Sequence, residues 1–152
     1  MRQIWLAKLT RALLYFAVAL IALLLMGLYG VPALRQLLFG MYELADASGV
    51  PLAMAFFTAM GLLALWILLE LIGILRTVDT DPFVPRNVLA LFRIGCAAEA
   101  AGLAFFASCF IHPTFMMAVS ALVMALCGLF ALVLCQVFRR AVEYKQENDL
   151  TI

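Results

Sequence analysis

Glu70 and Glu99 are the two residues whose type and position point most directly to chemistry, because each is an acidic residue inside a long apolar segment. Each lies about six residues from an arginine at the near end of its segment, Arg76 and Arg93 respectively. At about 1.5 Å per residue, both carboxyls should lie roughly 9 Å deep along their helices. A carboxylate at the centre of a membrane helix costs about 2.5–3.5 kcal/mol, and somewhat less nearer the interface, so we expect both side chains to face other helices.

The surroundings of Glu99 suggest what the two carboxyls could do together. Three small residues share its helical face: Gly95, Cys96 and Gly102. Such residues let a second helix approach closely. One hypothesis is that the carboxyls of Glu70 and Glu99 meet between the second and third apolar segments, where they would share a proton or bind a cation. The alternative is that each carboxyl serves packing, either neutral or paired with a neighbouring arginine.

No other group of residues indicates a catalytic or metal site. The cysteines lie inside apolar segments without a C-x-x-C pair, as expected of small buried apolar residues: Cys96, Cys109, Cys127 and Cys135. His112 is the sole histidine and lies at a turn, which does not make a metal site. The sequence also lacks the common phosphate-binding, dinucleotide-binding, zinc-protease and hydrolase motifs. We therefore predict that the protein is not an enzyme and carries no cofactor.

The composition predicts the environment of the elements that hold these residues. Hydrophobic residues make up 68% of the 152 residues and charged residues 12%, and the mean hydropathy is +1.14. A soluble domain is about 45–50% apolar and about 25% charged, and a soluble chain with this composition would expose large apolar patches. The net charge of +1 offers no global basic field. We expect a lipid bilayer as partner and no direct binding of nucleic acid.

Four apolar segments are long enough to cross a membrane, which takes about 20 residues in a helix. They cover residues 12–31, 52–75, 95–111 and 115–138, and Pro113 separates the last two. The first is too long for a cleavable signal peptide, whose apolar region has about 7–15 residues, so we expect it to be retained. The sequence thus predicts an all-α polytopic membrane protein: a four-transmembrane-helix bundle of two hairpins, forming one membrane domain over residues 1–152.

The distribution of positive charge predicts the orientation. Nine of the ten lysines and arginines lie within residues 2–11, 76–93 and 139–145, and Arg35 alone lies on the other side. Because short cytoplasmic flanks carry the excess of Lys and Arg, we expect both termini and the loop 76–94 to be cytoplasmic. This predicts a multi-pass protein of the bacterial inner membrane, with the loop 32–51 outside.

The external loop contains apolar residues at helical spacing: Leu34, Leu37, Leu38, Met41, Leu44 and Ala45. This pattern predicts a short amphipathic helix that lies on the outer membrane interface. The same residues could instead extend the first span or cap the helix bundle, and the sequence does not favour either interpretation.

The cytoplasmic loop and the tail, residues 139–152, form a predicted docking surface. Pro82 should turn the chain after the second span, and Pro85 suits the first turn of the third helix because it has no backbone donor. Helix-forming residues continue beyond Phe138, so the last helix should project about two turns into the cytoplasm, either solvated or as a docking handle. The surface comprises Asp81, Pro82, Phe83, Pro85, Arg86, Asn87, Arg93, Arg139, Arg140 and Tyr144.

Two stretches resemble a bacterial family of small four-span membrane proteins known only as a domain of unknown function: LRTVDTDPFVPRNVLALFRIG at residues 75–95 and VFRRAVEYKQENDLTI at residues 137–152. Members typically carry D-P-F-x-x-E-N before R-L-R-x-I-G and often end in an E-N-D-L-T-I-like tail. Here Arg86 stands in place of the glutamate, and apolar residues replace most of the basic ones before Arg93. Genes of this family often neighbour a small Cro-type helix-turn-helix regulator. The resemblance therefore implies a membrane partner that senses or sequesters a transcription regulator.

Three functions follow from these observations. The leading prediction is a non-enzymatic regulatory or partner-binding protein linked to such a small helix-turn-helix regulator. The first alternative is a small proton-coupled transporter or exporter that uses Glu70 and Glu99, although small four-span exporters carry their key glutamate in the first span, which has none here. The second alternative is a structural subunit of a membrane complex. A homo-oligomer is compatible with all three.

Overall fold

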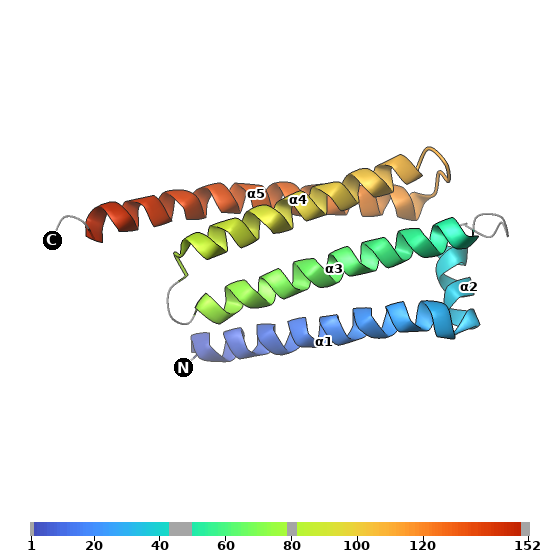
Figure 1. Cartoon of the computed structure of the whole chain (residues 1–152), viewed down its shortest axis with the longest axis horizontal. Helices are drawn as coiled ribbons and strands as arrows, with labels where there is room; N and C mark the ends of the chain where they lie inside the picture. The colour runs from blue at the N-terminus through green and yellow to red at the C-terminus, as the bar shows by residue number, and fades with distance from the viewer. Residues whose placement is uncertain (1, 43–49, 79–81, 150–152) are drawn as a thin grey trace.

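The chain forms five helices and no strand within the residues that this computed structural model describes, 2–42, 50–78 and 82–149. In chain order the helices are α1 (Arg2–Gly30), α2 (Pro32–Met41), α3 (Val50–Val78), α4 (Pro85–Ser108) and α5 (Phe115–Asp149) (Figure 1). The prediction of an all-α protein is confirmed. Pro85 occupies the first turn of α4, as its lack of a backbone donor predicts.

Four of the helices are long and apolar enough to cross a membrane, over Lys8–Gly30, Val50–Thr77, Pro85–Ser108 and Phe115–Asn148. Large apolar side chains cover their outer surfaces: Phe115 is 81% exposed, Met26 74% and Leu103 67%. Water would make such a surface costly, whereas lipid solvates it. The four apolar helices therefore match the predicted membrane protein.

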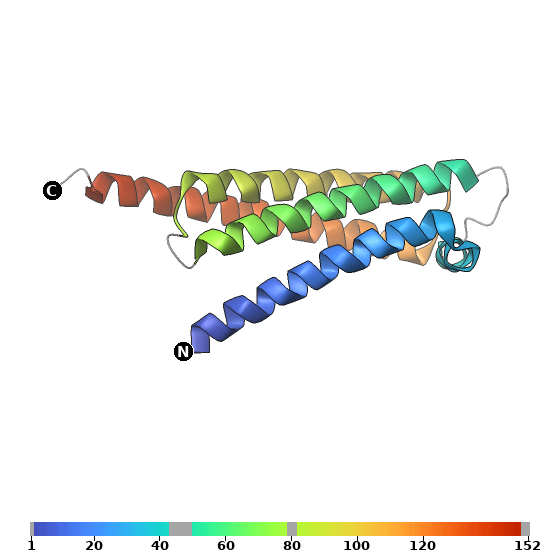
Figure 2. The same cartoon turned by 60° about the horizontal axis from the view of Figure 1, so that its bottom comes forward.

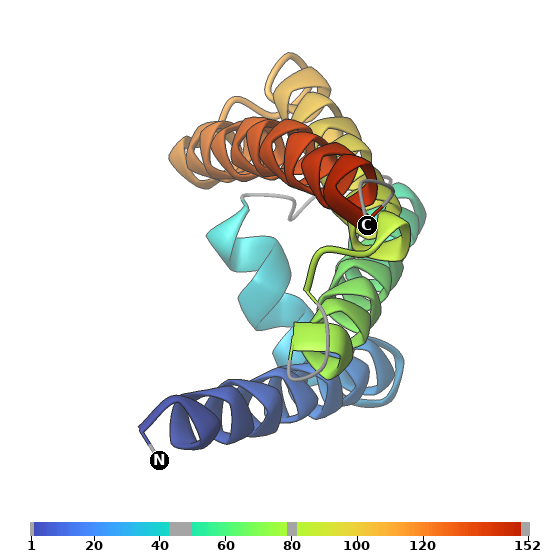
Figure 3. The ribbon, with the colours of Figure 1, turned by 90° about the vertical axis from the view of Figure 1, so that its left-hand side faces the viewer.

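The four long helices pack in chain order, with α1 on α3, α3 on α4 and α4 on α5. Seen along the long axis they follow a curve, and α1 and α5 lie at its two ends (Figure 3). α4 and α5 make the most extensive contact. Half of the apolar stretch of α4 is buried inside the protein, against 6% of the stretch in α3. α4 is therefore the central packing element of an open bundle.

α1 begins and α5 ends at one end of the molecule, where α3 also ends and α4 begins (Figure 1). We call this the terminal end and the opposite one the α2 end. α5 continues past the start of α4 at the terminal end (Figure 2) and stays helical to Asp149. The predicted continuation of the last helix beyond Phe138 is confirmed.

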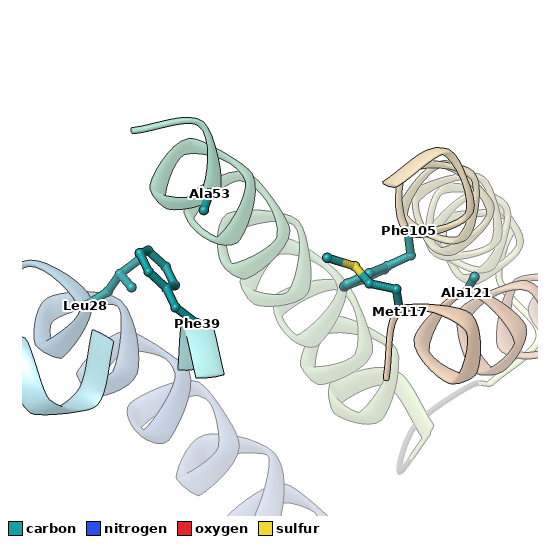
Figure 4. Close-up of a cluster of buried hydrophobic side chains, with 6 residues drawn as sticks. All are labelled: Leu28, Phe39, Ala53, Phe105, Met117 and Ala121. Carbon is teal, nitrogen blue, oxygen red and sulfur yellow. The ribbon is translucent and has the colours of Figure 1, made fainter. Parts of the chain in front are cut away.

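The α2 end holds the main cluster of buried apolar side chains, which come from all five helices: Leu28, Phe39, Ala53, Phe105, Met117 and Ala121 (Figure 4). The predicted helix in this region is confirmed over Pro32–Met41, while Leu44 and Ala45 lie outside the described residues. Phe39 is only 6% exposed and stacks on Phe57 of α3, with ring centroids 6.1 Å apart. Leu37 and Met41, by contrast, are 62% and 48% exposed. α2 thus caps the α1–α3 pair, in agreement with the capping interpretation that the sequence left open, and Leu38, one of the predicted apolar residues, packs against the same cluster. Phe39 was not among the predicted residues.

A short turn joins α4 to α5 at the α2 end. α4 ends at Ser108 and α5 begins at Phe115, so Pro113 separates the two helices as predicted. Thr114 is 8% exposed, and its Oγ1 accepts a hydrogen bond from the backbone nitrogen of Met117 at 3.3 Å. A threonine cap of this kind satisfies one of the free donors in the first turn of a helix.

Glycines let α4 and α5 approach each other closely. A Cβ added at Gly102 would lie 3.1 Å from the backbone nitrogen of Ala125 and 3.3 Å from the carbonyl oxygen of Ala121. A Cβ added at Gly95 would lie 2.6 Å from the Leu132 side chain. The small residues beside Glu99 therefore do bring a helix close, and that helix is α5.

Candidate functional site

Asn87 connects the end of α3 to the start of α4. Its side-chain Nδ2 donates to Thr77 Oγ1 at 2.7 Å and to the carbonyl oxygen of Pro82 at 2.8 Å. The Thr77 hydroxyl in turn donates to the carbonyl oxygen of Ile74 at 2.7 Å. Asn87 is 1% exposed. The expectation that it belongs to an exposed docking surface is therefore wrong: its side chain satisfies buried polar groups of the connection instead.

The sequence did contain a signal for this role of Asn87. Asparagine side chains often bond to nearby backbone groups where a chain turns, and Asn87 follows a turn marked by Pro82 and Pro85. The Nδ2 of Asn87 also donates to Thr77, which lies ten residues earlier in the chain. Periodicity alone does not predict that contact.

α5 packs against the same connection at the terminal end. The rings of Phe83 and Phe138 have centroids 5.6 Å apart, and Cys135 Sγ lies 3.3 Å from the carbonyl oxygen of Val88. Val142, in the extension of α5, is 7% exposed. The first turns of α4 and the last turns of α5 therefore form one packed unit with the connection.

An exposed surface remains on this unit. It includes six residues of the predicted docking surface: Pro85, Arg86, Arg93, Arg139, Arg140 and Tyr144. Phe83 is still 42% exposed, Pro82 is half-buried, and Asp81 lies outside the described residues. An open groove of about 500 Å³ runs between the start of α4 and the extension of α5, lined by Pro85, Val88, Arg139, Val142, Glu143 and Gln146. The structure thus brings the predicted loop and tail residues to one end of the molecule.

Glu70 lies at the contact between α3 and α4. Its Oε1 is 3.2 Å from Nη1 of Arg93, and the two side chains are 21% and 49% exposed. The Arg86 guanidinium also lies over α3, since a Cβ added at Gly73 would be 3.8 Å from Arg86 Nη2. Glu70 is therefore paired with an arginine, which is one of the two arrangements expected for a membrane carboxylate.

Glu99 faces the other neighbour of α4. A Cβ added at Gly128 of α5 would lie 2.7 Å from Glu99 Oε1 and 3.0 Å from its Cδ. Oε1 is buried, and no hydrogen-bond partner for it is found in the described part of the chain. The side chain also lines an apolar groove of about 450 Å³ between α4 and α5. Gly128 thus provides the space that the Glu99 carboxyl occupies.

The structure does not bring the two carboxyls together. Glu70 is paired across the α3–α4 contact, whereas Glu99 lies against α5. Glu99 is also six residues further along α4 than Arg93, which is about 9 Å at 1.5 Å per residue. The structure therefore does not support one site shared by the two carboxyls between the second and third spans. Each carboxyl has its own environment.

Two further arginines bond to neighbouring helices near the terminal end. Arg11 Nη2 donates to the carbonyl oxygen of Leu75 at 2.8 Å. Arg76 Nη2 donates to the hydroxyl of Tyr15 at 3.0 Å. Both bonds join α1 to the last turn of α3. These cations therefore hold the α1–α3 pair together in addition to contributing positive charge.

The cysteines do not form pairs or metal clusters in the described part of the chain. Cys96 and Cys127 are exposed on the apolar outer surface, Cys109 is half-buried and Cys135 is buried. Residues 2–42, 50–78 and 82–149 contain no group of three or more His, Cys, Asp or Glu residues that could hold a metal ion. Within the same residues, two cysteines have a polar contact: Cys109 Sγ lies 3.3 Å from the carbonyl oxygen of Phe105 at the end of α4, and Cys135 Sγ packs on α4 as described above.

Four apolar helices, a capped α2 end and a polar terminal end define a small multi-pass membrane protein. A family model described as "Protein of unknown function (DUF2975)" matches residues 5–152, and the chain belongs to this family. The match confirms the family resemblance and covers α2 to α5 in full and α1 from residue 5 onward. No match was found among curated proteins or among solved structures.

Proposed function

We propose that this chain is a non-enzymatic protein of the bacterial inner membrane that binds a cytoplasmic protein through its terminal end. The observation that carries the proposal is the extension of α5, which stays helical to Asp149 beyond the start of α4. Beside it lies the groove of about 500 Å³ at the start of α4. A rigid helix and a pre-formed groove reduce the ordering cost of binding a partner.

The orientation in this proposal rests on charge. Basic residues gather at the terminal end, where Arg76, Arg86, Arg93, Arg139 and Arg140 lie, while the α2 end has Arg35. Lysine and arginine concentrate in cytoplasmic flanks, which supports a cytoplasmic position for the proposed docking surface.

The chemistry of the terminal end suits a protein partner. Tyr144 is 72% exposed, and exposed Arg139 and Arg140 lie beside it on α5. Tyrosine and arginine are the residue types enriched where binding energy concentrates. The family resemblance suggests a small helix-turn-helix regulator as the partner, held away from or released to its DNA.

The geometry supports the two alternative functions less well than it supports the binding of a cytoplasmic protein. Proton-coupled transport through a joint Glu70–Glu99 site would need the two carboxyls to meet, and they lie at different helix contacts. A structural subunit of a membrane complex would use the apolar outer surface rather than the terminal groove. Neither alternative accounts for the projecting end of α5.

Site-specific crosslinking in cells tests this proposal. A photoreactive amino acid replaces Tyr144 on the α5 extension, and a matched control replaces Gln36, which is exposed on α2 at the other end. We expect position 144 to capture a small cytoplasmic DNA-binding protein that position 36 does not. Arg140→Glu combined with Tyr144→Ala should reduce co-purification of that protein by about tenfold or more, a loss typical of removing central anchors. Capture of the same proteins from both positions, or of membrane proteins alone, would contradict the proposal.

A further inference from the structure

The groove between α4 and α5 combines an apolar wall with one carboxyl. Its volume is about 450 Å³, and its lining includes Gly102, Leu103, Phe106, Ala118 and Leu122 together with Glu99. Pockets for small molecules typically measure about 300–1,000 Å³ and have mostly apolar walls with a few polar groups. The groove therefore has the size and composition of a small-molecule site.

The carboxyl in this groove is built into the helix contact. Gly128 leaves the space that it fills, since a Cβ added there would lie 2.7 Å from Glu99 Oε1. That oxygen is buried and has no hydrogen-bond partner within residues 2–42, 50–78 and 82–149. A buried polar group without a partner is costly. The α4–α5 pair thus has a buried acceptor, Glu99 Oε1, without a partner in the described residues, and the same side chain lines the apolar groove.

The lining of the groove supplies no positive charge to Glu99. All the residues that line it, apart from Glu99, are uncharged. The preceding cation on α4, Arg93, already bonds to Glu70 on the opposite side of the helix. An acidic residue inside a membrane segment is normally paired or lines a pathway for ligands or ions. In its ionised form, Glu99 would therefore take a cation that the groove lining does not supply.

The groove is open toward the surrounding lipid. Leu103, Phe106 and Leu122 on its sides are 67%, 56% and 61% exposed, and they belong to the apolar surface that faces the bilayer. A hydrophilic cation would have to leave water to reach this depth. A cation with a large apolar body dissolves in the bilayer and can enter the groove sideways.

We propose that the α4–α5 groove binds a lipophilic monocation, whose apolar body lies on Phe106 and Leu122 and whose charge lies next to the Glu99 carboxyl. The site is separate from the terminal end, so it does not depend on the docking of a cytoplasmic protein. Glu70 is not part of it, because Arg93 already neutralises that carboxyl.

Equilibrium binding of radiolabelled tetraphenylphosphonium to the full chain in phosphatidylcholine nanodiscs tests this site, with empty nanodiscs subtracted. We expect saturable binding, and we expect Glu99→Gln to weaken it by about tenfold or more, because the charge partner is lost while the side-chain volume is kept. Glu70→Gln removes the other membrane carboxyl and should leave binding within about twofold. Triphenylphosphine oxide, a neutral aromatic probe, should not compete.

A second variant tests the same groove without changing Glu99, in case Glu99→Gln does not fold. Ala118 lines the groove and is itself exposed, so Ala118→Phe should fill the groove, abolish tetraphenylphosphonium binding and leave helicity and oligomeric mass unchanged. The proposal is overturned by three results: no saturable binding, binding by Glu99→Gln equal to that of the unmodified chain, or equal competition by the neutral probe. It is also overturned if Ala118→Phe changes the oligomeric mass without affecting any binding, since the groove would then be a contact between copies of this chain.

Discussion

α4 contacts its two neighbours through different kinds of interaction: polar contacts with α3 and close backbone packing with α5. On the α3 side, polar groups form the contact: Asn87 bonds to Thr77, and Arg93 pairs with Glu70. On the α5 side, small residues bring two backbones together, and Gly102 lies directly against Ala121 and Ala125. The α5 side has the more extensive contact. In a membrane, where water does not drive helices together, both close backbone packing and interhelical hydrogen bonds supply the attraction between helices.

The two carboxyls show the same contrast. Glu70 lies on the polar side, is 21% exposed and has an arginine partner. Glu99 lies on the close-packed side, where Gly128 accommodates it without supplying a partner. A glutamate therefore completes an ion pair on the α3 side of α4, whereas a glutamate on the α5 side keeps a buried oxygen without a hydrogen-bond partner in the described part of the chain.

Gly102→Leu is expected to have the largest effect on stability. The added side chain would meet backbone atoms of Ala121 and Ala125, which cannot move aside without separating α4 from α5. Overpacking of this kind costs about 1–3 kcal/mol, and the rigid neighbours here favour the upper part of that range. Unfolding in mixed micelles by titration with a denaturing detergent, followed by circular dichroism, measures the loss.

Gly40→Leu is the matched control, because a Cβ at Gly40 would meet nothing within 4 Å. We expect it to change the unfolding free energy by less than about 0.5 kcal/mol. Equal losses at Gly102 and Gly40 would show that close approach of α4 and α5 is not what stabilises this side.

Asn87→Ala is expected to cost less, about 1–2 kcal/mol in the unfolding free energy. The substitution leaves the Pro82 carbonyl oxygen without its bond from Nδ2 and removes a buried donor from Thr77. The same detergent titration measures it, and Asn148→Ala, at an exposed position of α5, serves as the control. If both substitutions were equally mild, the polar connection between α3 and α4 would contribute little.

The smallest expected effect is the coupling between Glu70 and Arg93. Because Arg93 is 49% exposed, we expect a double-mutant cycle of Glu70→Gln and Arg93→Gln to give a coupling of about 0.2–1 kcal/mol. The same cycle with Glu99→Gln in place of Glu70→Gln should give a coupling near zero. A larger coupling to Glu99 than to Glu70 would reverse the assignment of the two carboxyls to opposite sides of α4.

The sequence predicted most of the fold because the length and apolar composition of a segment are enough to identify a membrane helix. The four long helices, the break at Pro113 and the helical start at Pro85 all follow from local chemistry. The short helix between the first two spans was predicted from apolar spacing, and capping of the bundle was one of its two interpretations, but the residue that makes the buried contact was not predicted. Phe39, which anchors α2, faces Phe57 of a different helix, and no spacing within one segment reveals that neighbour.

The candidate sites were predicted less well, for a related reason. Glu70 and Glu99 were selected because charge in an apolar segment is costly, and that argument holds for any arrangement of the helices. It did not reveal which helix each carboxyl faces. Asn87 was placed on the docking surface for its polarity, whereas its bonds to Thr77 and Pro82 bury it.

By itself the sequence determined the class of protein, the helical segments and the end at which positive charge gathers, because these depend on composition and on local residue order. The tertiary structure decided which faces of α4 meet α3 and α5. Small residues permit close approach to any helix, and only the three-dimensional arrangement selects α5 for that role. The same selection pairs Glu70 with Arg93 and places Glu99 against Gly128, so the difference between the two carboxyls arises from packing rather than from residue type.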